Sequence, residues 1–262
     1  MKKTNWMPWI NLAALTLALV MNVLANALPL NGQTTGEISD RFPVYFVPAS
    51  YVFAIWGLIY LGLLAFGIYQ ALPAQSPKGN PHLQRIGFWF ALGCVANAVW
   101  ILLWHYEFFV LTVPVMLVLL ISLIVIYLRL GIGRSRVSSA ERWLVHVPFS
   151  IYLGWITVAT VANVTDALSY LGWSGWGIGA QAWAVIMLFV AAGVALFVNW
   201  TRADVAYVLV IVWAFAGIGV KQAGIELVAR AARAMAVVVA LPLVVTVPRH
   251  RPKGAGPETP PK

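Results

Sequence analysis

The chain has 262 residues, of which 61% are hydrophobic and only 10% are charged. A soluble domain carries roughly a quarter charged residues, so this sequence has too little polar surface for a water-soluble globule. The formal net charge is +9, but the basic residues lie in short loops and tails and form no run with interleaved aromatic residues, which argues against nucleic acid as a partner. The composition therefore predicts an integral membrane protein whose main partner is the lipid bilayer.

Eight apolar segments, each about 20 residues long, can be drawn along the chain, and this length suits a membrane-spanning helix. They cover residues 7–28, 48–71, 83–104, 108–130, 143–168, 180–199, 203–220 and 225–247. The first follows two lysines, as in a signal peptide, but its apolar run is too long for one, so we expect a retained membrane helix. The sequence thus predicts an all-α, polytopic membrane helix bundle.

The basic residues indicate how these segments are oriented. With the N-terminus inside, the inner segments carry Lys2, Lys3, Lys78, Arg85, Arg129, Arg134, Arg136, Arg142, Arg202, Arg249, Arg251 and Lys253. Loops rich in Lys and Arg stay on the cytoplasmic side, so we expect both termini there, in a bacterial inner membrane. The Pro-rich stretch 248–262 is expected to be a disordered cytoplasmic tail.

Neither cysteine nor histidine forms a metal-binding pattern. Cys94 is the only cysteine, which excludes an intrachain disulfide and a thiolate cluster. The four histidines are scattered near segment ends, and no two of them have ligand spacing within one helix. We therefore expect no fixed zinc or haem site and no required cofactor.

Three of the expected helices carry aromatic or amide side chains at helical spacing. The stripes comprise Phe53, Trp56 and Tyr60 in the second segment, Asn97 and Trp100 in the third, and Tyr152, Trp155, Ala159 and Asn163 in the fifth. Phe46 and Pro48 come just before the first stripe. Residues three or four apart share one helix face, so the stripes are expected to converge on a pocket for a flat, mostly apolar ligand. No carboxylate cluster lies at mid-membrane, so an inorganic ion does not suit this pocket.

A simpler interpretation of the same residues stays open. Intramembrane Asn and Trp side chains often only bond across helices and hold a bundle together. The loop NGQTTGEISDRFPVYF, residues 31–46, likewise has two interpretations. It is either a lid over the outer mouth or an ordinary interfacial loop with an aromatic belt.

The three stripes resemble a known family. FVPASYVFAIWGLIYLG, residues 46–62, resembles the second helix of the TspO/MBR family, the tryptophan-rich sensory proteins related to the translocator protein (peripheral benzodiazepine receptor). That helix follows roughly the pattern W-x-P-P-x-x-x-F-x-x-V-W-x-x-L-Y-x-x-M-G. NAVWILLW resembles the third-helix pattern N-x-x-W, and YLGWITVATVAN resembles the fifth-helix pattern Y-x-x-W-x-x-x-A-x-x-x-N. The resemblance covers about residues 1–170.

The resemblance implies a five-helix core over residues 1–170 that binds a porphyrin or haem-type ligand in a cavity capped by the first loop. It also implies a homodimer and a link to tetrapyrrole and stress regulation. Two departures concern prolines: Ala49 replaces the second proline of the pair, and Ile151 replaces the proline of the fifth helix. The shape of the lid and the range of ligands are therefore expected to differ from those of the family.

About three additional membrane helices, in residues 171–247, follow this core, and the family pattern does not explain them. Within them, Arg230 and Arg233 are three residues apart. Intramembrane charge is costly and usually functional or paired, so one hypothesis has these arginines facing the bundle interior or reaching to the outer surface, with Glu226 as a candidate partner of Arg230. The alternative is that they lie at the membrane interface.

Three functions are compatible with these features. The first is a sensor or carrier that binds tetrapyrroles in the aromatic pocket. The second is a secondary transporter of a hydrophobic small molecule, although no clear repeat relates the two halves of the chain. The third is a light- and oxygen-dependent porphyrin-degrading protein, which would act through Trp56 or Trp155 because no acid–base or metal constellation is evident. An enzymatic role is thus the less favoured one.

Overall fold

The computed structural model describes residues 6–28, 30–71 and 81–250, and the regular elements in these ranges are all helical. The long helices are α1 (Met7–Ala27), α3 (Ile55–Ala71), α5 (Trp89–His105), α6 (Phe109–Leu130), α8 (Val147–Tyr170), α9 (Ala180–Arg202), α10 (Val205–Lys221) and α11 (Glu226–Ala240). The short helices are α2 (Thr35–Asp40), α4 (Pro81–Ile86), α7 (Ser139–Glu141) and α12 (Leu243–His250), and single turns are η1 (Leu30–Gly32), η2 (Ser50–Ala54), η3 (Arg142–His146) and η4 (Gly175–Gly177). Within the described ranges, six helical stretches are long and apolar enough to cross a membrane, and α5 and α10 are shorter apolar helices. These elements confirm the predicted all-α polytopic membrane bundle.

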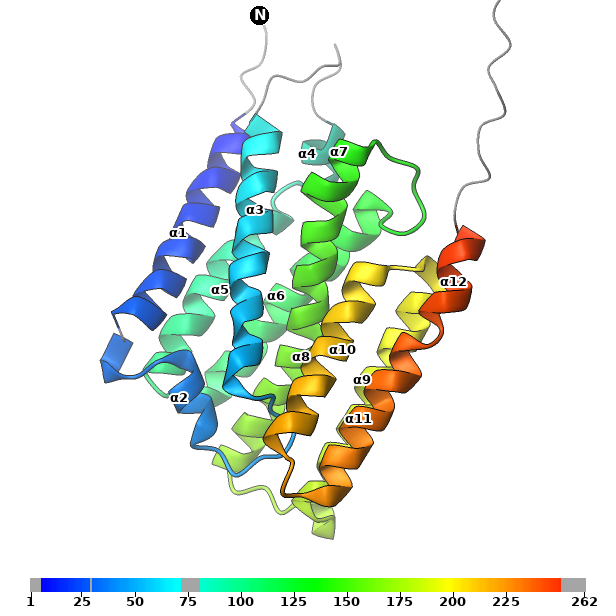
Figure 1. Ribbon diagram of the computed structural model, residues 1–262. Coiled ribbons are helices and arrows are strands. Elements are labelled where there is room, and N and C mark those ends of the chain that lie inside the picture. Colours follow the sequence, from blue (N-terminus) through cyan, green and yellow to red (C-terminus); the bar gives the residue numbers. More distant parts are fainter. Residues whose placement is uncertain (1–5, 29, 72–80, 251–262) are drawn as a thin grey trace, which may run out of the picture.

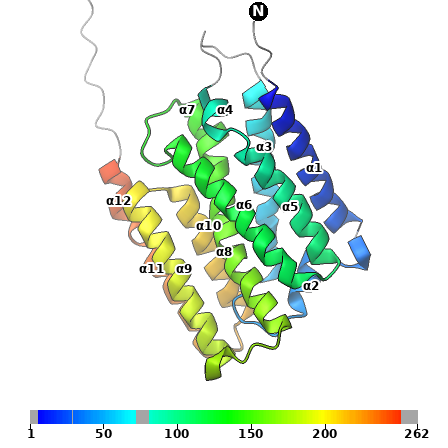
Figure 2. The same cartoon turned by 180° about the vertical axis from the view of Figure 1, so that it is seen from behind.

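The first five long helices form a closed ring. Helix α1 packs against α3 and α5, α5 packs against α6, α6 against α8, and α8 against α3. We call this group the five-helix ring. Helices α9, α10 and α11 each contact the other two, and α10 also packs along α8 (Figures 1 and 2). We call this second group the three-helix unit.

Three boundaries differ from the expected segments. The third segment is split, because Gly87 takes a positive φ of 56° between α4 and α5. The eighth is split near Pro242, which separates α11 from α12 because proline cannot continue a helical hydrogen-bond ladder. The sixth segment extends beyond its expected end at residue 199, because α9 continues to Arg202 and the turn before α10 lies at Ala203 and Asp204. Helix α12 extends to His250, and the rest of the predicted tail lies outside the described residues.

Glycines allow the three-helix unit to approach the ring closely. A Cβ at Gly154 of α8 would lie 3.0 Å from the carbonyl oxygen of Tyr207 on α10. A Cβ at Gly217 of α10 would lie 2.2 Å from Cγ2 of Val52, in the turn that leads into α3. Backbones this close are typical of small residues at helix interfaces in membranes. Helix α10 therefore supports both α8 and the start of α3.

Hydrogen bonds reinforce the contact between α10 and the start of α3. The amide of Ala49 donates to the carbonyl of Gly217 at 3.2 Å, and Nε1 of Trp213 donates to the carbonyl of Val52 at 3.2 Å. The ring of Trp213 also lies edge-on to Tyr51, with centroids 5.4 Å apart. The indole N–H at mid-helix in α10 thus has a hydrogen-bond partner within the protein.

A polar joint ties the ring to the unit at the end where α4 and α7 lie. Asp204 caps the N-terminus of α10 by accepting from the amide of Tyr207 at 3.2 Å. Its other oxygen accepts from the hydroxyls of Tyr127 at 2.8 Å and Ser150 at 2.6 Å. Burial outweighs these hydrogen bonds and raises the pKa of Asp204 above its ordinary value. One carboxyl group therefore connects α6, α8 and α10.

Candidate functional site

Five aromatic side chains from α3, its preceding turn and α8 meet inside the ring. Trp56 is stacked on Tyr60, with centroids 5.4 Å apart and planes at 17°. Trp56 also lies edge-on to Tyr152 at 6.0 Å and to Trp155 at 6.1 Å, and Phe53 lies edge-on to Trp155 at 5.6 Å. Edge-to-face and offset contacts at these distances are favourable. We call these five residues the aromatic cluster.

A layer of amides lies beside the cluster and links four helices. Asn97 of α5 accepts at Oδ1 from Nδ2 of Asn22 on α1 at 2.7 Å. Asn163 of α8 accepts from Nε1 of Trp100 at 3.2 Å and donates to Oγ1 of Thr112 at 2.7 Å. These bonds are the cross-helix packing that the simpler interpretation predicts for Asn and Trp. The side chains of the amide layer therefore bond to one another across helices, and these bonds need no ligand.

The aromatic cluster differs from the amide layer because it holds two polar atoms without partners. The hydroxyl of Tyr60 and Nε1 of Trp155 are buried, and among the described residues neither has a hydrogen-bond partner. Oδ1 of Asp166, one turn beyond Asn163 on α8, is likewise buried without a hydrogen-bond partner among the described residues. A buried polar group without a partner costs free energy, so each such atom calls for an explanation, and a bound ligand is one explanation.

The eleven residues predicted from the sequence fall into three groups. Phe53, Trp56, Tyr60, Tyr152 and Trp155 form the aromatic cluster, and Asn97, Trp100 and Asn163 belong to the amide layer. Ala159 is partly buried and packs against the hydrophobic core. Pro48 lies beside Gly217 of α10, and a Cβ built at Gly217 would be 3.2 Å from the Cβ of Pro48. Phe46 is fully buried and does not belong to the cluster. The structure thus brings eight of the eleven into or beside the ring interior.

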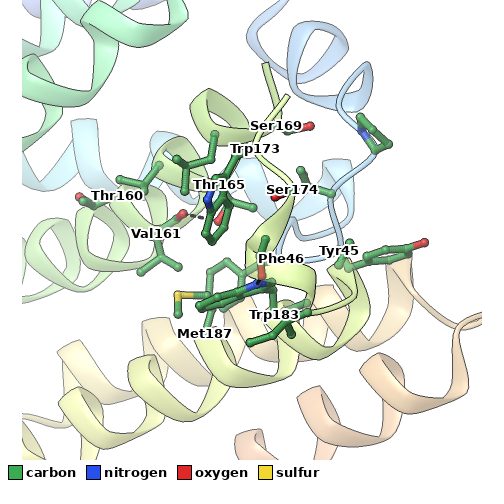
Figure 3. Close-up of a pocket in the computed structure, with 18 residues that line it drawn as sticks. Tyr45, Phe46, Thr160, Val161, Thr165, Ser169, Trp173, Ser174, Trp183 and Met187 are labelled. Carbon is green, nitrogen blue, oxygen red and sulfur yellow. Dashed lines mark hydrogen bonds between the residues drawn. The ribbon is translucent and has the colours of Figure 1, made fainter. Parts of the chain in front are cut away.

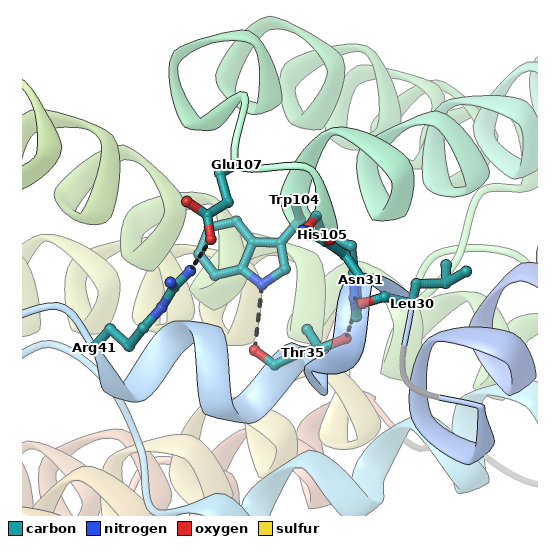
Figure 4. A network of polar contacts seen from close by, with 7 residues as sticks. All are labelled: Leu30, Asn31, Thr35, Arg41, Trp104, His105 and Glu107. Carbon is teal, nitrogen blue, oxygen red and sulfur yellow. Dashed lines mark hydrogen bonds and ion pairs between the residues drawn. The ribbon is translucent and has the colours of Figure 1, made fainter.

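The first loop packs against the end of α5 through a network of polar contacts (Figure 4). Nε1 of Trp104 donates to the carbonyl of Thr35 at 3.2 Å. His105 is fully buried, with Nδ1 3.1 Å from the carbonyl oxygen of Leu30 and Nε2 3.1 Å from Oγ1 of Thr35. An ion pair joins Arg41 to Glu107 at 2.9 Å. The end of α5 therefore holds η1 and α2 in place.

The loop also inserts an aromatic ring that the sequence reasoning missed. Phe42 lies 6.0 Å from the ring of Trp104 and edge-on to Phe109 at 4.9 Å. Trp104 in turn is stacked on Trp100 at 5.3 Å. A column of rings therefore runs from the loop toward the amide layer. The sequence did contain a signal for this contact, namely the aromatic residues near the end of the loop. Of these, only Phe46 was predicted to be a site residue.

A cavity of about 440 Å³ lies outside the ring, between α8, α9 and the end of the first loop (Figure 3). Its lining includes Phe46, Thr160, Thr165, Trp173, Trp183 and Met187. Phe46 alone among the eleven predicted residues lines it. Within the described ranges, no group of three or more His, Cys, Asp and Glu side chains is placed to hold a metal ion.

Comparison with known proteins identifies the family. A family model described as "TSPO-like protein" matches residues 8–245, which includes the ring and all three helices of the unit. No curated protein and no solved structure matches the chain. The additional helices, which the second-, third- and fifth-helix motifs did not explain, are thus part of what this family model describes. The chain is an integral membrane protein that belongs to the TSPO-like protein family.

Proposed function

We propose that this protein binds a flat, mostly apolar ligand, such as a porphyrin, at the aromatic cluster inside the five-helix ring. The observation that carries the proposal is the pair of unpartnered polar atoms, the hydroxyl of Tyr60 and Nε1 of Trp155, among stacked and edge-on rings. A ligand that accepts hydrogen bonds from them would remove the cost of leaving them unpaired.

The chemistry of the cluster favours a conjugated ring system. An indole N–H can only donate, and a phenol hydroxyl can donate or accept, so the ligand needs an acceptor atom within its flat framework. A porphyrin offers both a large flat face and ring nitrogens. No charged side chain belongs to the cluster, so the bulk of the ligand must be apolar.

Burial within the cluster supports entry along α3. Trp56 and Tyr60 are half-buried, whereas Tyr152 and Trp155 are almost fully buried. The rings touch one another, so a ligand must displace at least one of them to insert its face. The α3 wall is the side that can move without opening the packing between α8 and the rest of the ring, and we propose that Trp56 turns aside on binding.

A titration with protoporphyrin IX tests the proposal. Tryptophan fluorescence of the detergent-purified protein would be followed for the wild type, for Trp56→Phe/Trp155→Phe, and for the control Trp143→Phe/Trp200→Phe. The control also removes two tryptophans, but these are 67% and 64% exposed and lie outside the ring. We expect saturable quenching by wild type and control, and a loss of affinity of roughly tenfold or more in the cluster variant. Equal affinity in all three proteins would refute the proposed site.

The distribution of charge supports an orientation with both termini in the cytoplasm. The α4 end carries six arginines, Arg85, Arg129, Arg134, Arg136, Arg142 and Arg202, whereas the α2 end carries fewer basic residues, Arg41, Lys221, Arg230 and Arg233. Since positive loops stay inside, we propose that the α4 end faces the cytoplasm of a bacterial inner membrane. Single cysteines at Arg134 and Glu107, in a Cys94→Ser background, would be labelled from opposite sides by an impermeant thiol reagent.

A further inference from the structure

The face of α8 that carries Trp155 continues past the aromatic cluster to a second unpartnered polar group. Ala159, Ala162 and Asp166 follow Trp155 at steps of four, three and four, so they lie on one face of the helix. At a rise of about 1.5 Å per residue, Trp155 and Asp166 are about 16 Å apart along α8. Both are nearly fully buried, whereas Ala159 and Ala162 between them are only partly buried. Neighbouring side chains therefore do not completely fill this stretch of the face.

Helix α3 covers only the first part of this face. The two helices are antiparallel, because Gly62 lies against Pro148, with a Cβ there 3.1 Å from the proline ring, whereas Phe53 lies against Trp155. The turn η2 that leads into α3 begins only a few residues before Phe53, but α8 continues well past Trp155. A ligand seated at the aromatic cluster therefore has a path along α8, beyond the start of α3, toward Asp166.

The carboxyl group of Asp166 is not compensated within the described parts of the chain. Its Oδ1 has no hydrogen-bond partner there, and no ion pair reaches it. Lys221, at the end of α10, acts on this carboxyl electrostatically, but its ammonium group is paired with Asp40 of α2. An ionisable side chain within a membrane helix is costly and is usually paired or functional. The partner of Asp166 is therefore to be sought outside the chain.

The charges near this end of the ring favour a cation as that partner. Arg41 of the first loop pairs with Glu107. Lys221 pairs with Asp40. Each of these two basic side chains already has an acidic partner, which leaves Asp166 as a buried carboxyl without a counter-charge. Charge-assisted hydrogen bonds are stronger than neutral ones, and a protonated amine supplies both the positive charge and the donors.

We propose that Asp166 is a ligand-binding residue of the ring site, and that the ligand carries a protonated amine on an arm of its flat ring system. The ring system accepts a hydrogen bond from Nε1 of Trp155, and the arm runs along Ala159 and Ala162 to bring the ammonium group to Oδ1 of Asp166. The inference rests on the proposed binding site in the ring and adds to it the charge of the ligand. The cavity outside the ring, which Ala184 lines, belongs to a different face of α8.

The test compares three porphyrins that share one ring system. They are protoporphyrin IX, with its two carboxylates, the uncharged dimethyl ester, and the bis(2-aminoethyl) amide, a diamine with two ammonium groups. Quenching of tryptophan fluorescence would be titrated in a neutral detergent for the wild type, for Asp166→Asn and for the control Glu226→Gln. The control also removes a carboxylate from the α2 end, but one that is 73% exposed and lies outside the ring.

We expect the wild type and the control to bind the diamine roughly tenfold or more tighter than the ester, and the dicarboxylate most weakly. In Asp166→Asn the preference for the diamine should disappear, while the affinity for the ester stays unchanged, because only the charge is removed. The melting temperature should not fall, since Oδ1 of Asp166 has no hydrogen bond to lose among the described residues. If Asp166→Asn does not fold, Asp166→Ser removes the same charge.

The outcomes separate this inference from the site on which it rests. No saturable binding of any of the three porphyrins to the wild type would remove the ring site and the inference with it. Saturable binding of the ester, with no preference for the diamine, would overturn the inference alone. So would a preference for the diamine that persists in Asp166→Asn. If that variant also melts at a markedly lower temperature, Asp166 is a structural partner of Lys221 instead.

Discussion

The five-helix ring and the three-helix unit fill their interiors with different side chains. The ring buries large rings and amides, and two polar atoms of its aromatic cluster have no partner among the described residues. The unit buries many small residues, including Ala184, Ala191, Ala192, Ala195, Ala214, Ala229 and Ala232, together with the rings of Tyr207 and Phe215 and the amide of Asn199. Small residues let helices pack closely and leave little room between them. This difference supports our proposal that the ring binds the ligand, while the unit packs against the ring from outside.

The strongest support is the contact at Gly217, so breaking it should have the largest effect. In Gly217→Ala the new Cβ would lie 2.2 Å from Val52 and 3.2 Å from Pro48. Overpacking of this kind typically costs about 1–3 kcal/mol, and we expect the upper part of that range because the backbones are hydrogen-bonded here. Thermal unfolding in detergent would measure the loss.

The matched control is Gly193→Ala, on α9, where a Cβ meets nothing within 4 Å. This substitution should leave stability unchanged or raise it slightly, because alanine is the better helix former. If both substitutions have the same effect, α10 does not hold the start of α3, and the supporting role of the unit is wrong.

Disrupting the polar joint at Asp204 should cause the next largest loss of stability. Asp204→Ala removes the helix cap of α10 and the acceptor for Tyr127 and Ser150. We expect a loss of about 2 kcal/mol in the free energy of unfolding, from the cap and the charged hydrogen bonds together.

The same residue makes stability depend on pH. Burial raises the pKa of Asp204 in the folded protein, so between the unfolded and folded pKa values the folded state binds more protons. Stability due to this group is therefore present below the unfolded pKa and falls as pH rises through the folded pKa. Asp204→Asn should remove this part of the pH dependence of the melting temperature. A wild-type stability that instead rises over this window because of Asp204 would contradict the assignment.

Within the ring, the amide layer should matter less. Asn163→Leu removes the acceptor of Trp100 and the donor to Thr112. Hydrogen bonds between membrane helices are worth about 0.6 kcal/mol on average, so we expect a loss of about 1 kcal/mol. Protoporphyrin affinity should change little, since the unpartnered atoms belong to Tyr60 and Trp155. A much larger fall in affinity than in stability would move the ligand site into the amide layer.

The smallest effect is expected on the outer face of the unit. Arg230 pairs with Glu226, and both side chains are about three-quarters exposed, at 76% and 73%. Exposed ion pairs are worth about 0–1 kcal/mol, so Arg230→Gln should change the melting temperature very little. A marked loss of stability or of ligand binding would mean that Arg230 faces an intramembrane partner, as one hypothesis from the sequence held.

The sequence predicted the aromatic cluster because helical periodicity places side chains on faces. Phe53, Trp56 and Tyr60 had to share a face of α3, and Tyr152 and Trp155 a face of α8. Periodicity does not say which neighbour a face meets, so the contact of Phe42 with Trp104 was not predicted. That contact depends on how the first loop folds over the end of α5.

The cavity could not be predicted for a related reason. Val161, Val164 and Leu168 read as an ordinary apolar helix face, and only the position of α9 beside them encloses a space. The supporting role of α10 could not be predicted either. The sequence shows a single glycine at position 217, but only the fold shows that Val52 packs against it. The break near Pro242, by contrast, follows from proline chemistry and was available from the sequence.

The most direct test of the account is a protoporphyrin IX titration of Ala184→Phe beside Trp56→Phe/Trp155→Phe. One variant fills the cavity outside the ring, and the other alters the cluster inside it. The account predicts that Ala184→Phe binds protoporphyrin with wild-type affinity and that the cluster variant loses roughly tenfold or more. Loss of binding in Ala184→Phe with binding retained in the cluster variant would place the porphyrin site between the ring and the three-helix unit and contradict the account.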